Sequence, residues 1–227
     1  MPTAAELEIL ALSVKVAFVG LAASLPFAIA VALVLARKDF PGKTLFDAIV
    51  HLPLVLPPVV VGFALLLLFG TQGPIGKLLE PLGIVFAFRW TGAALAAAIM
   101  GFPLLVRAIR LAIEAVDPRL ELAARTLGAK RSRVFFTVTL PLAMSGVITG
   151  ALLAFARALG EFGATVTFVS NIPGQTQTLP LAIYTYTQVP GGDAMALRLS
   201  IFSVLLSVLA LALSEWLTRR HAGARHA

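Results

Sequence analysis

Five long apolar stretches constrain this chain more than any other feature. Each has about the 20 residues that a helix needs to cross a lipid bilayer, and each ends at charged or turn-forming residues. They occupy residues 16–36, 49–69, 91–107, 134–156 and 199–217. Only 13% of the residues are charged, about half the share of a soluble domain. We therefore predict an all-α integral membrane protein, with five transmembrane helices forming a single domain over residues 1–227.

The distribution of cations predicts how the helices are oriented. Lysine and arginine are enriched in the cytoplasmic loops of membrane proteins. The loop after the first span, the segment 107–133 and the residues after 216 hold 13 of the 18 lysines and arginines. We assign these regions to the cytoplasm, so the N-terminus is expected outside and the C-terminus inside.

Two outer loops follow from this orientation, at residues 70–90 and 170–198, and both are rich in glycine and proline. The second contains the apolar run LAIYTYT, which is too short to span the membrane. This run therefore either dips into the membrane or covers the outer mouth of the protein.

A basic segment between the third and fourth spans, ELAARTLGAKRSRVFFTVTLP at residues 121–141, calls for a specific explanation. Asp117 is suited to cap a helix, Pro118 fits a first helical turn, and Gly128 fits a helix stop. The segment 117–133 is therefore predicted to form a short cytoplasmic helix followed by cations.

Three interpretations of this segment are open. The spacing of Ala124, Gly128 and Val134 matches a helix-turn-helix, but Val134 begins the next membrane span and leaves no room for a free recognition helix. We therefore predict no nucleic-acid partner. The cations could simply determine topology, or the short helix could dock on a cytoplasmic partner.

The docking interpretation is favoured by a resemblance. The stretch AARTLGAKRSRVFFTVTLP resembles the loop shared by permease subunits of bacterial ABC importers, with an alanine pair, a glycine four residues later and a following Leu-Pro. The matching positions here are Ala123, Ala124, Gly128, Leu140 and Pro141. The resemblance implies type I ABC importer permease architecture, in which a coupling helix docks in a groove of a separate ATPase subunit.

The sequence departs from this family pattern at one position. The family's commonest form has a glutamate directly before the alanine pair, whereas here Leu122 holds that position and the acid is Glu121. The residues expected to couple to the ATPase are Glu121, Ala123, Ala124 and Gly128. Two alanines permit close packing, and the glycine lets the chain turn back toward the bilayer.

Two further stretches narrow the resemblance. HLPLVLPPVVVGFALLLLFG and FARALGEFGATVTFVSNIPGQTQTLPLAIYTYTQVPGGD are similar to the permease subunits of molybdate importers, relatives of the tungstate and sulfate permeases. The resemblance implies a homodimer in the bacterial inner membrane, working with two cytoplasmic ABC ATPase subunits and a periplasmic molybdate-binding protein. A sulfate or thiosulfate permease is the alternative substrate assignment. A secondary carrier or channel is the alternative of a different class.

Residues inside the spans give candidates for the translocation path or gate. Arg157 and Glu161 are four residues apart, so on a continuous helix they share a face and can neutralise each other. They either form an outer gate or hold two helices together. Pro57 and Pro58 remove backbone donors within the second span and leave carbonyls free to line a path, although kinks are also common in membrane bundles.

The sequence contains no phosphate-binding GxxxxGK[ST] motif, no metal-spaced histidine cluster and no nucleophile paired with a base. We therefore predict no catalytic residue, no metal site and no cofactor in this chain. ATP and Mg²⁺ are expected to bind to the partner ATPase subunit. Transport energy would then come from that subunit.

Overall fold

The computed structural model describes residues 3–223, and every regular element in that part of the chain is helical. The elements are α1 (Ala4–Arg37), α2 (Lys43–Val55), α3 (Pro58–Phe69), α4 (Pro74–Leu79), a 3₁₀ turn (Glu80–Leu82), α5 (Trp90–Glu114), α6 (Pro118–Thr126), α7 (Arg131–Val134), a π-helical turn (Phe135–Thr139), α8 (Leu140–Leu159), α9 (Gly163–Val169), α10 (Leu179–Gln188) and α11 (Asp193–Gly223).

Four of these helical segments are long and apolar enough to cross a membrane. They are α1, α5, the continuous run Arg131–Leu159 that includes α8, and α11 over Asp193–Ala210. The pair α2 and α3 supplies a fifth span if the two are counted together. The predicted all-α membrane fold is therefore confirmed.

The second predicted span, residues 49–69, is not one straight helix. α2 and α3 meet at an angle of 112°. Leu56 and Pro57 at the junction adopt extended backbone angles, with ψ of 142° and 133°. A proline disfavours the helical conformation in the residue before it and has no N–H to continue the ladder. Two consecutive prolines therefore break the span where the hydropathy pattern shows no interruption.

The ends of the other helices also differ from the sequence prediction. α1 begins at Ala4 rather than residue 16, because Thr3 and Glu6 form a reciprocal capping box. The third helix continues beyond residue 107 to Glu114. The fourth runs from Arg131 to Leu159 and the fifth begins at Asp193, so both exceed their apolar cores. The predicted location of the C-terminus concerns residues 224–227, which lie outside the described residues.

The centre of the bundle is α5, which packs along both α1 and α8. Small residues allow these helices to approach closely, as is usual between membrane helices. A Cβ at Gly20 of α1 would lie 2.6 Å from the carbonyl oxygen of Ala94 on α5, and a Cβ at Gly146 of α8 would collide with Ala112. The buried apolar residues around α5 include Met100, Leu105 and Ile109.

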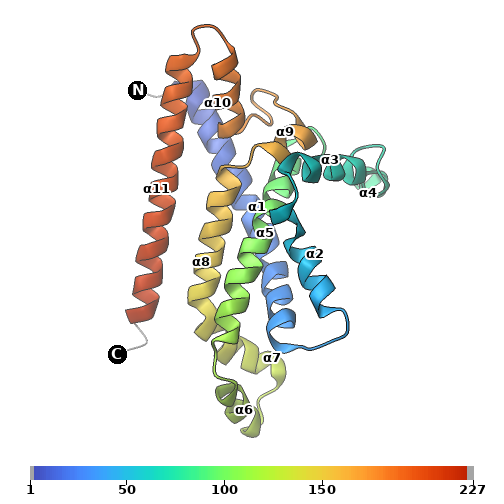
Figure 1. Cartoon of the computed structure of the whole chain (residues 1–227), viewed down its shortest axis with the longest axis vertical. Helices are drawn as coiled ribbons and strands as arrows, with labels where there is room; N and C mark the ends of the chain where they lie inside the picture. The colour runs from blue at the N-terminus through green and yellow to red at the C-terminus, as the bar shows by residue number, and fades with distance from the viewer. Residues whose placement is uncertain (1–2, 224–227) are drawn as a thin grey trace.

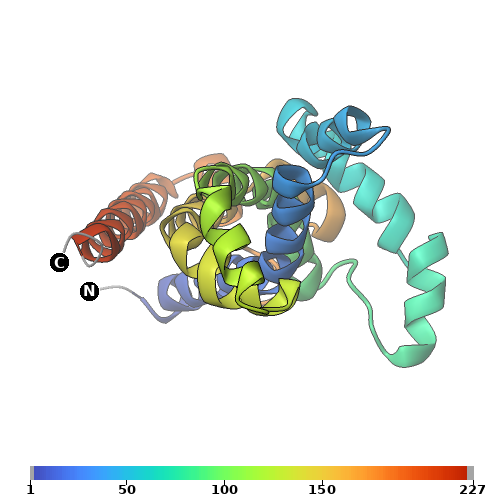
Figure 2. The same cartoon turned by 90° about the horizontal axis from the view of Figure 1, so that it is seen from below.

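The two ends of the bundle carry different short helices (Figure 1). α6 lies beyond the ends of the long helices at one end, and α10 lies at the other. α11 starts at the α10 end, runs to the α6 end and stands to one side of the bundle in both views (Figures 1 and 2). α1 also starts at the α10 end. The first and last described helices therefore both run from the α10 end of the bundle toward the α6 end.

Candidate functional site

The expected coupling helix is α6, and its two ends are formed by the residues that the sequence indicated. The Asp117 side chain accepts a hydrogen bond from the Arg119 amide at 2.9 Å, and Pro118 occupies the first turn. After the helix, Gly128 has φ of +85°, a conformation that favours glycine. The Ala129 amide donates to the Ala124 carbonyl at 3.1 Å, closing the helix end.

The outer surface of α6 is uncovered, with exposed leucines beside the exposed Arg119 and Arg125. No residue of α6 is buried. Leu120 and Leu122 have 49% and 56% of their surface exposed, and Leu127, which follows the helix, has 88% exposed. Ala123 is exposed and Ala124 is half-buried beside them. A small helix protruding from the bundle with three exposed leucines has the character of a docking surface, which we call the α6 face.

Glu121 does not belong to the α6 face. Its Oε1 atom accepts hydrogen bonds from Arg37 Nη2 at 2.8 Å and from Thr139 Oγ1 at 2.9 Å. Arg37 also donates to the Val116 carbonyl oxygen at 3.2 Å. The Glu121 carboxylate therefore ties α6 to the end of α1 and to the π-helical turn that leads into α8.

The proline break in the second span lies against the break between α8 and α9. A Cβ at Gly163 would lie only 2.8 Å from the Cβ of Pro58, and a Cβ at Gly62 would collide with the backbone of Ala164. The start of α3 and the start of α9 thus pack with almost no side chain between them. This brings Pro57 and Pro58 close to the segment that carries Glu161.

Arg157 and Glu161 form the ion pair that their spacing indicated. Arg157 Nη1 lies 2.6 Å from Glu161 Oε2, and the side chain of Glu161 is only 2% exposed. The other carboxylate oxygen, Oε1, accepts a hydrogen bond from the Ala164 amide at 2.8 Å. Glu161 therefore also holds the first turn of α9, so the pair joins α8 to the packed junction with α3.

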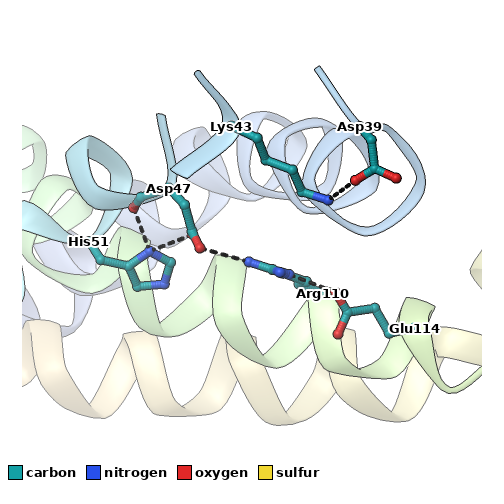
Figure 3. Close-up of polar contacts among 6 residues, drawn as sticks. All are labelled: Asp39, Lys43, Asp47, His51, Arg110 and Glu114. Carbon is teal, nitrogen blue, oxygen red and sulfur yellow. Dashed lines mark hydrogen bonds and ion pairs between the residues drawn. The ribbon is translucent and has the colours of Figure 1, made fainter. Parts of the chain in front are cut away.

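A second charged cluster joins α2 to α5 nearer the α6 end (Figure 3). Arg110 on α5 contacts Asp47 on α2 through Nη1 at 2.9 Å and Glu114 through Nε at 2.7 Å. His51 Nδ1 lies 2.9 Å from the Asp47 carbonyl oxygen and 3.1 Å from its carboxylate. Both neighbours of Nδ1 are hydrogen-bond acceptors.

These four side chains line a pocket of about 320 Å³, together with Arg107 and Leu111. At the edge of this region, the start of α2 carries an exposed pair in which Lys43 Nζ lies 2.9 Å from Asp39 Oδ1. The hydrogen bond and charge of Lys43 lower the pKa of Asp39. This cluster is not among the residues singled out from the sequence, although the i,i+4 spacing of Asp47 with His51 and of Arg110 with Glu114 was a usable signal.

Comparison with known proteins shows the family of this chain. Residues 24–222 match the model of the binding-protein-dependent transport system inner membrane component. The chain belongs to this family. It is therefore a multi-pass membrane permease and a transport component of an ABC importer.

Relatives of this permease carry names that distinguish substrates. The molybdenum transport system permease protein ModB of Escherichia coli (strain K12) is 60% identical over 215 residues, which is 94% of each chain. The ModB of Mycobacterium tuberculosis is 44% identical over 200 residues, covering 88% of this chain and 75% of that protein. The sulfate transport system permease protein CysW of Synechocystis is 37% identical over 214 residues, covering 93% and 76%.

Solved structures agree with the permease fold. An amino acid ABC transporter superposes with a TM-score of 0.67 at 19% identity, covering 95% of this chain and 94% of that one. A bacterial alginate ABC transporter in complex with an alginate pentasaccharide-bound periplasmic protein gives a TM-score of 0.74 at 16% identity, covering 94% and 78%. The likeness establishes the expected importer architecture.

The site residues predicted from the sequence fall into two groups at different positions along the bundle. Glu121, Ala123, Ala124 and Gly128 belong to the α6 region, although Glu121 faces the bundle. Pro57, Pro58, Arg157 and Glu161 gather at the junction of α3, α8 and α9. Within the described residues there is no group of three or more His, Asp or Glu side chains that could hold a metal ion.

Proposed function

We propose that this chain is the membrane-spanning permease subunit of an ATP-driven importer for molybdate, with tungstate as a chemically similar second substrate. The subunit forms the translocation path and couples to a separate ATPase subunit. The observation that carries the substrate assignment is the 60% identity to the Escherichia coli molybdenum permease over 94% of both chains, compared with 37% to the sulfate permease.

The α6 face supports the coupling role. Three exposed leucines on a protruding helix lose contact with water when a partner covers them, and burial of a leucine contributes about 2 kcal/mol. Glu121 links this helix to α1 and to the entry of α8. A displacement of α6 by the ATPase subunit is therefore passed directly to two of the long helices.

The partners follow from this role. Two copies of the chain form a homodimer around the path, and each copy docks through its α6 face on one of two cytoplasmic ABC ATPase subunits, which bind ATP and Mg²⁺. A periplasmic molybdate-binding protein delivers the anion at the α10 end. In this arrangement the N-terminus is periplasmic and the C-terminus is cytoplasmic in the bacterial inner membrane, in accordance with the cation distribution.

The test is uptake of labelled molybdate at low concentration by cells with and without this chain. We expect chain-dependent uptake that persists in excess unlabelled sulfate and disappears when the ATPase subunit is made unable to hydrolyse ATP. Loss of uptake under excess sulfate would assign the permease to sulfate instead. Uptake that continues without a working ATPase would contradict the ATP-driven mechanism and favour a carrier.

A further inference from the structure

A groove of about 500 Å³ runs between α5 and α8, on the side of the bundle that also carries the charged pocket. Its walls are mostly apolar, but Arg107 lies at its edge and Ser145 and Thr149 of α8 line it. Arg107 and Leu111 also line the charged pocket. The groove and the pocket therefore meet at Arg107, giving one continuous surface from His51 on α2 to the lining of α8.

Arg107 differs from its neighbour Arg110 in having no counter-ion. Arg110 contacts two carboxylates, those of Asp47 and Glu114. Arg107 is exposed, and no ion pair or hydrogen bond of its side chain is found within residues 3–223. Arg107 lies at the cytoplasmic end of the third predicted span, where an unpaired charge facing lipid is costly. Arg107 therefore favours water or an anion as its surroundings.

Two hydroxyl groups on α8, those of Ser145 and Thr149, also favour water or an anion as their surroundings. Ser145 and Thr149 are half-buried, and neither hydroxyl has a hydrogen-bond partner in the described part of the chain. A hydroxyl placed against hydrocarbon without a partner costs free energy. Two such groups one helical turn apart, beside an unpaired arginine, are typical of a surface that water reaches.

The groove between α5 and α8 leads toward the ion pair of Arg157 with Glu161. Ser145, Thr149, Leu153 and Arg157 stand at successive i+4 positions on α8, a row that winds slowly around the helix. At 1.5 Å per residue, the row covers about 18 Å from Ser145 to Arg157. It thus connects the groove at Arg107 with the junction where Arg157 pairs with Glu161.

We propose that the groove between α5 and α8 is the inner half of the anion path, and that Arg107 is a binding station for a tetrahedral oxyanion before its release into the cytoplasm. The proposal rests on the importer function above and adds a ligand site to it. Asp47 and Glu114 together balance the two guanidinium groups of the pocket, Arg110 and Arg107, so Arg107 attracts an anion only weakly. Passage requires such weak binding, because a tightly bound anion would not leave.

The chain contains no cysteine, so single cysteines can be introduced without removing others. The experiment places Thr149→Cys in the full complex with its ATPase subunit in inverted membrane vesicles. It compares the rates of labelling by membrane-impermeant thiol reagents that carry a negative or a positive charge. We expect rapid labelling at position 149, faster with the anionic reagent and slowed by added molybdate.

Arg107→Gln in the Thr149→Cys background should lower the ratio of anionic to cationic labelling rates by about tenfold, whereas Arg107→Lys should preserve most of it. The matched control is Val204→Cys on α11, where the residue is 62% exposed within an apolar span and should react slowly with both reagents. Equal rates at positions 149 and 204, or an unchanged ratio in Arg107→Gln, would overturn the proposal.

The phosphate of an anionic lipid is the other source of the same ligand chemistry. A groove filled by lipid would leave position 149 unreactive and unaffected by molybdate, which would also overturn the proposal. Protection by sulfate but not by molybdate would support an anion station at Arg107 while contradicting molybdate as the transported substrate. The two conclusions can therefore fail separately.

Discussion

The Glu121 carboxylate and the Arg37 guanidinium, 84 positions apart in the chain, lie 2.8 Å from each other. Both side chains are 22% exposed, and Thr139 donates a second hydrogen bond to the same carboxylate oxygen. One acidic residue therefore connects the coupling helix to α1 and to the start of the fourth span. The α6 face lies on the side of the helix left free by this contact.

Glu121→Gln is expected to weaken this connection without removing the α6 face. The loss is about 1 kcal/mol, because a charge-assisted hydrogen bond is replaced in a partly exposed setting. The ATPase subunit should still co-purify, while molybdate uptake per ATP hydrolysed falls. Asp39→Asn is the control, since it removes the charge from a 98% exposed carboxylate. Loss of uptake in both variants alike would argue against a specific role for Glu121.

Gly128→Ala should disturb the end of α6. An alanine at φ of +85° costs about 1 to 2 kcal/mol, so the turn after the coupling helix is expected to shift and co-purification of the ATPase subunit to decrease. Gly83→Ala imposes a similar backbone cost at φ of +73° in the loop after α4. That variant should retain the ATPase subunit, and equal loss in the two would indicate general destabilisation.

Leu127→Asp tests the α6 face directly. The residue is 88% exposed, so the substitution should leave the isolated permease folded but place a charge in the docking surface. We expect the ATPase subunit to be lost in pull-down assays. Leu78→Asp on α4, where the leucine is 74% exposed, is the matched control. Retention of the ATPase subunit by Leu127→Asp would remove the α6 face from the docking interface.

Glu161→Gln should lower both the thermal stability of the complex and uptake. The glutamine oxygen can still accept from the Ala164 amide, so the change isolates the ion pair and leaves Arg157 without its counter-ion. Because Arg157 is 28% exposed, the cost should be about 2 kcal/mol, below that of breaking a fully buried pair.

The double variant Arg157→Gln, Glu161→Gln separates the two roles considered for this pair. Removal of both charges should recover most of the melting temperature. If uptake recovers as well, the pair serves only to hold helices together. If uptake stays low while stability recovers, the charges act in the path or gate.

The sequence predicted the membrane fold, a short helix between the third and fourth spans with its cap at Asp117 and stop at Gly128, and the contact between Arg157 and Glu161. Each of these depends on residues close together in the chain, where apolar length, capping chemistry and i,i+4 spacing are informative. The sequence did not predict the 112° angle between the two halves of the second span. Hydropathy records how apolar Leu56 and Pro57 are, but it does not record the direction of the chain through them.

The position of Glu121 could not be predicted in the same way. Glu121 stands one position before the family's usual glutamate and was expected to couple to the ATPase with the alanines. Only the fold shows that its carboxylate accepts hydrogen bonds from Arg37 and Thr139. The cluster of Asp47 with Arg110 similarly joins residues 63 positions apart. Their i,i+4 neighbours were visible in the sequence, but the pairing between α2 and α5 was not.

The sequence by itself determined that this chain crosses a membrane, which segments are apolar enough to do so and where a short helix leaves the bundle. These properties follow from the local free energy of placing side chains and backbone in lipid or water. The tertiary structure decided which charges meet and which stay unpaired, so that Arg110 has two carboxylates and Arg107 has none. Helix packing makes that choice, because small residues such as Gly20 and Gly146 set how closely and in what register the helices approach.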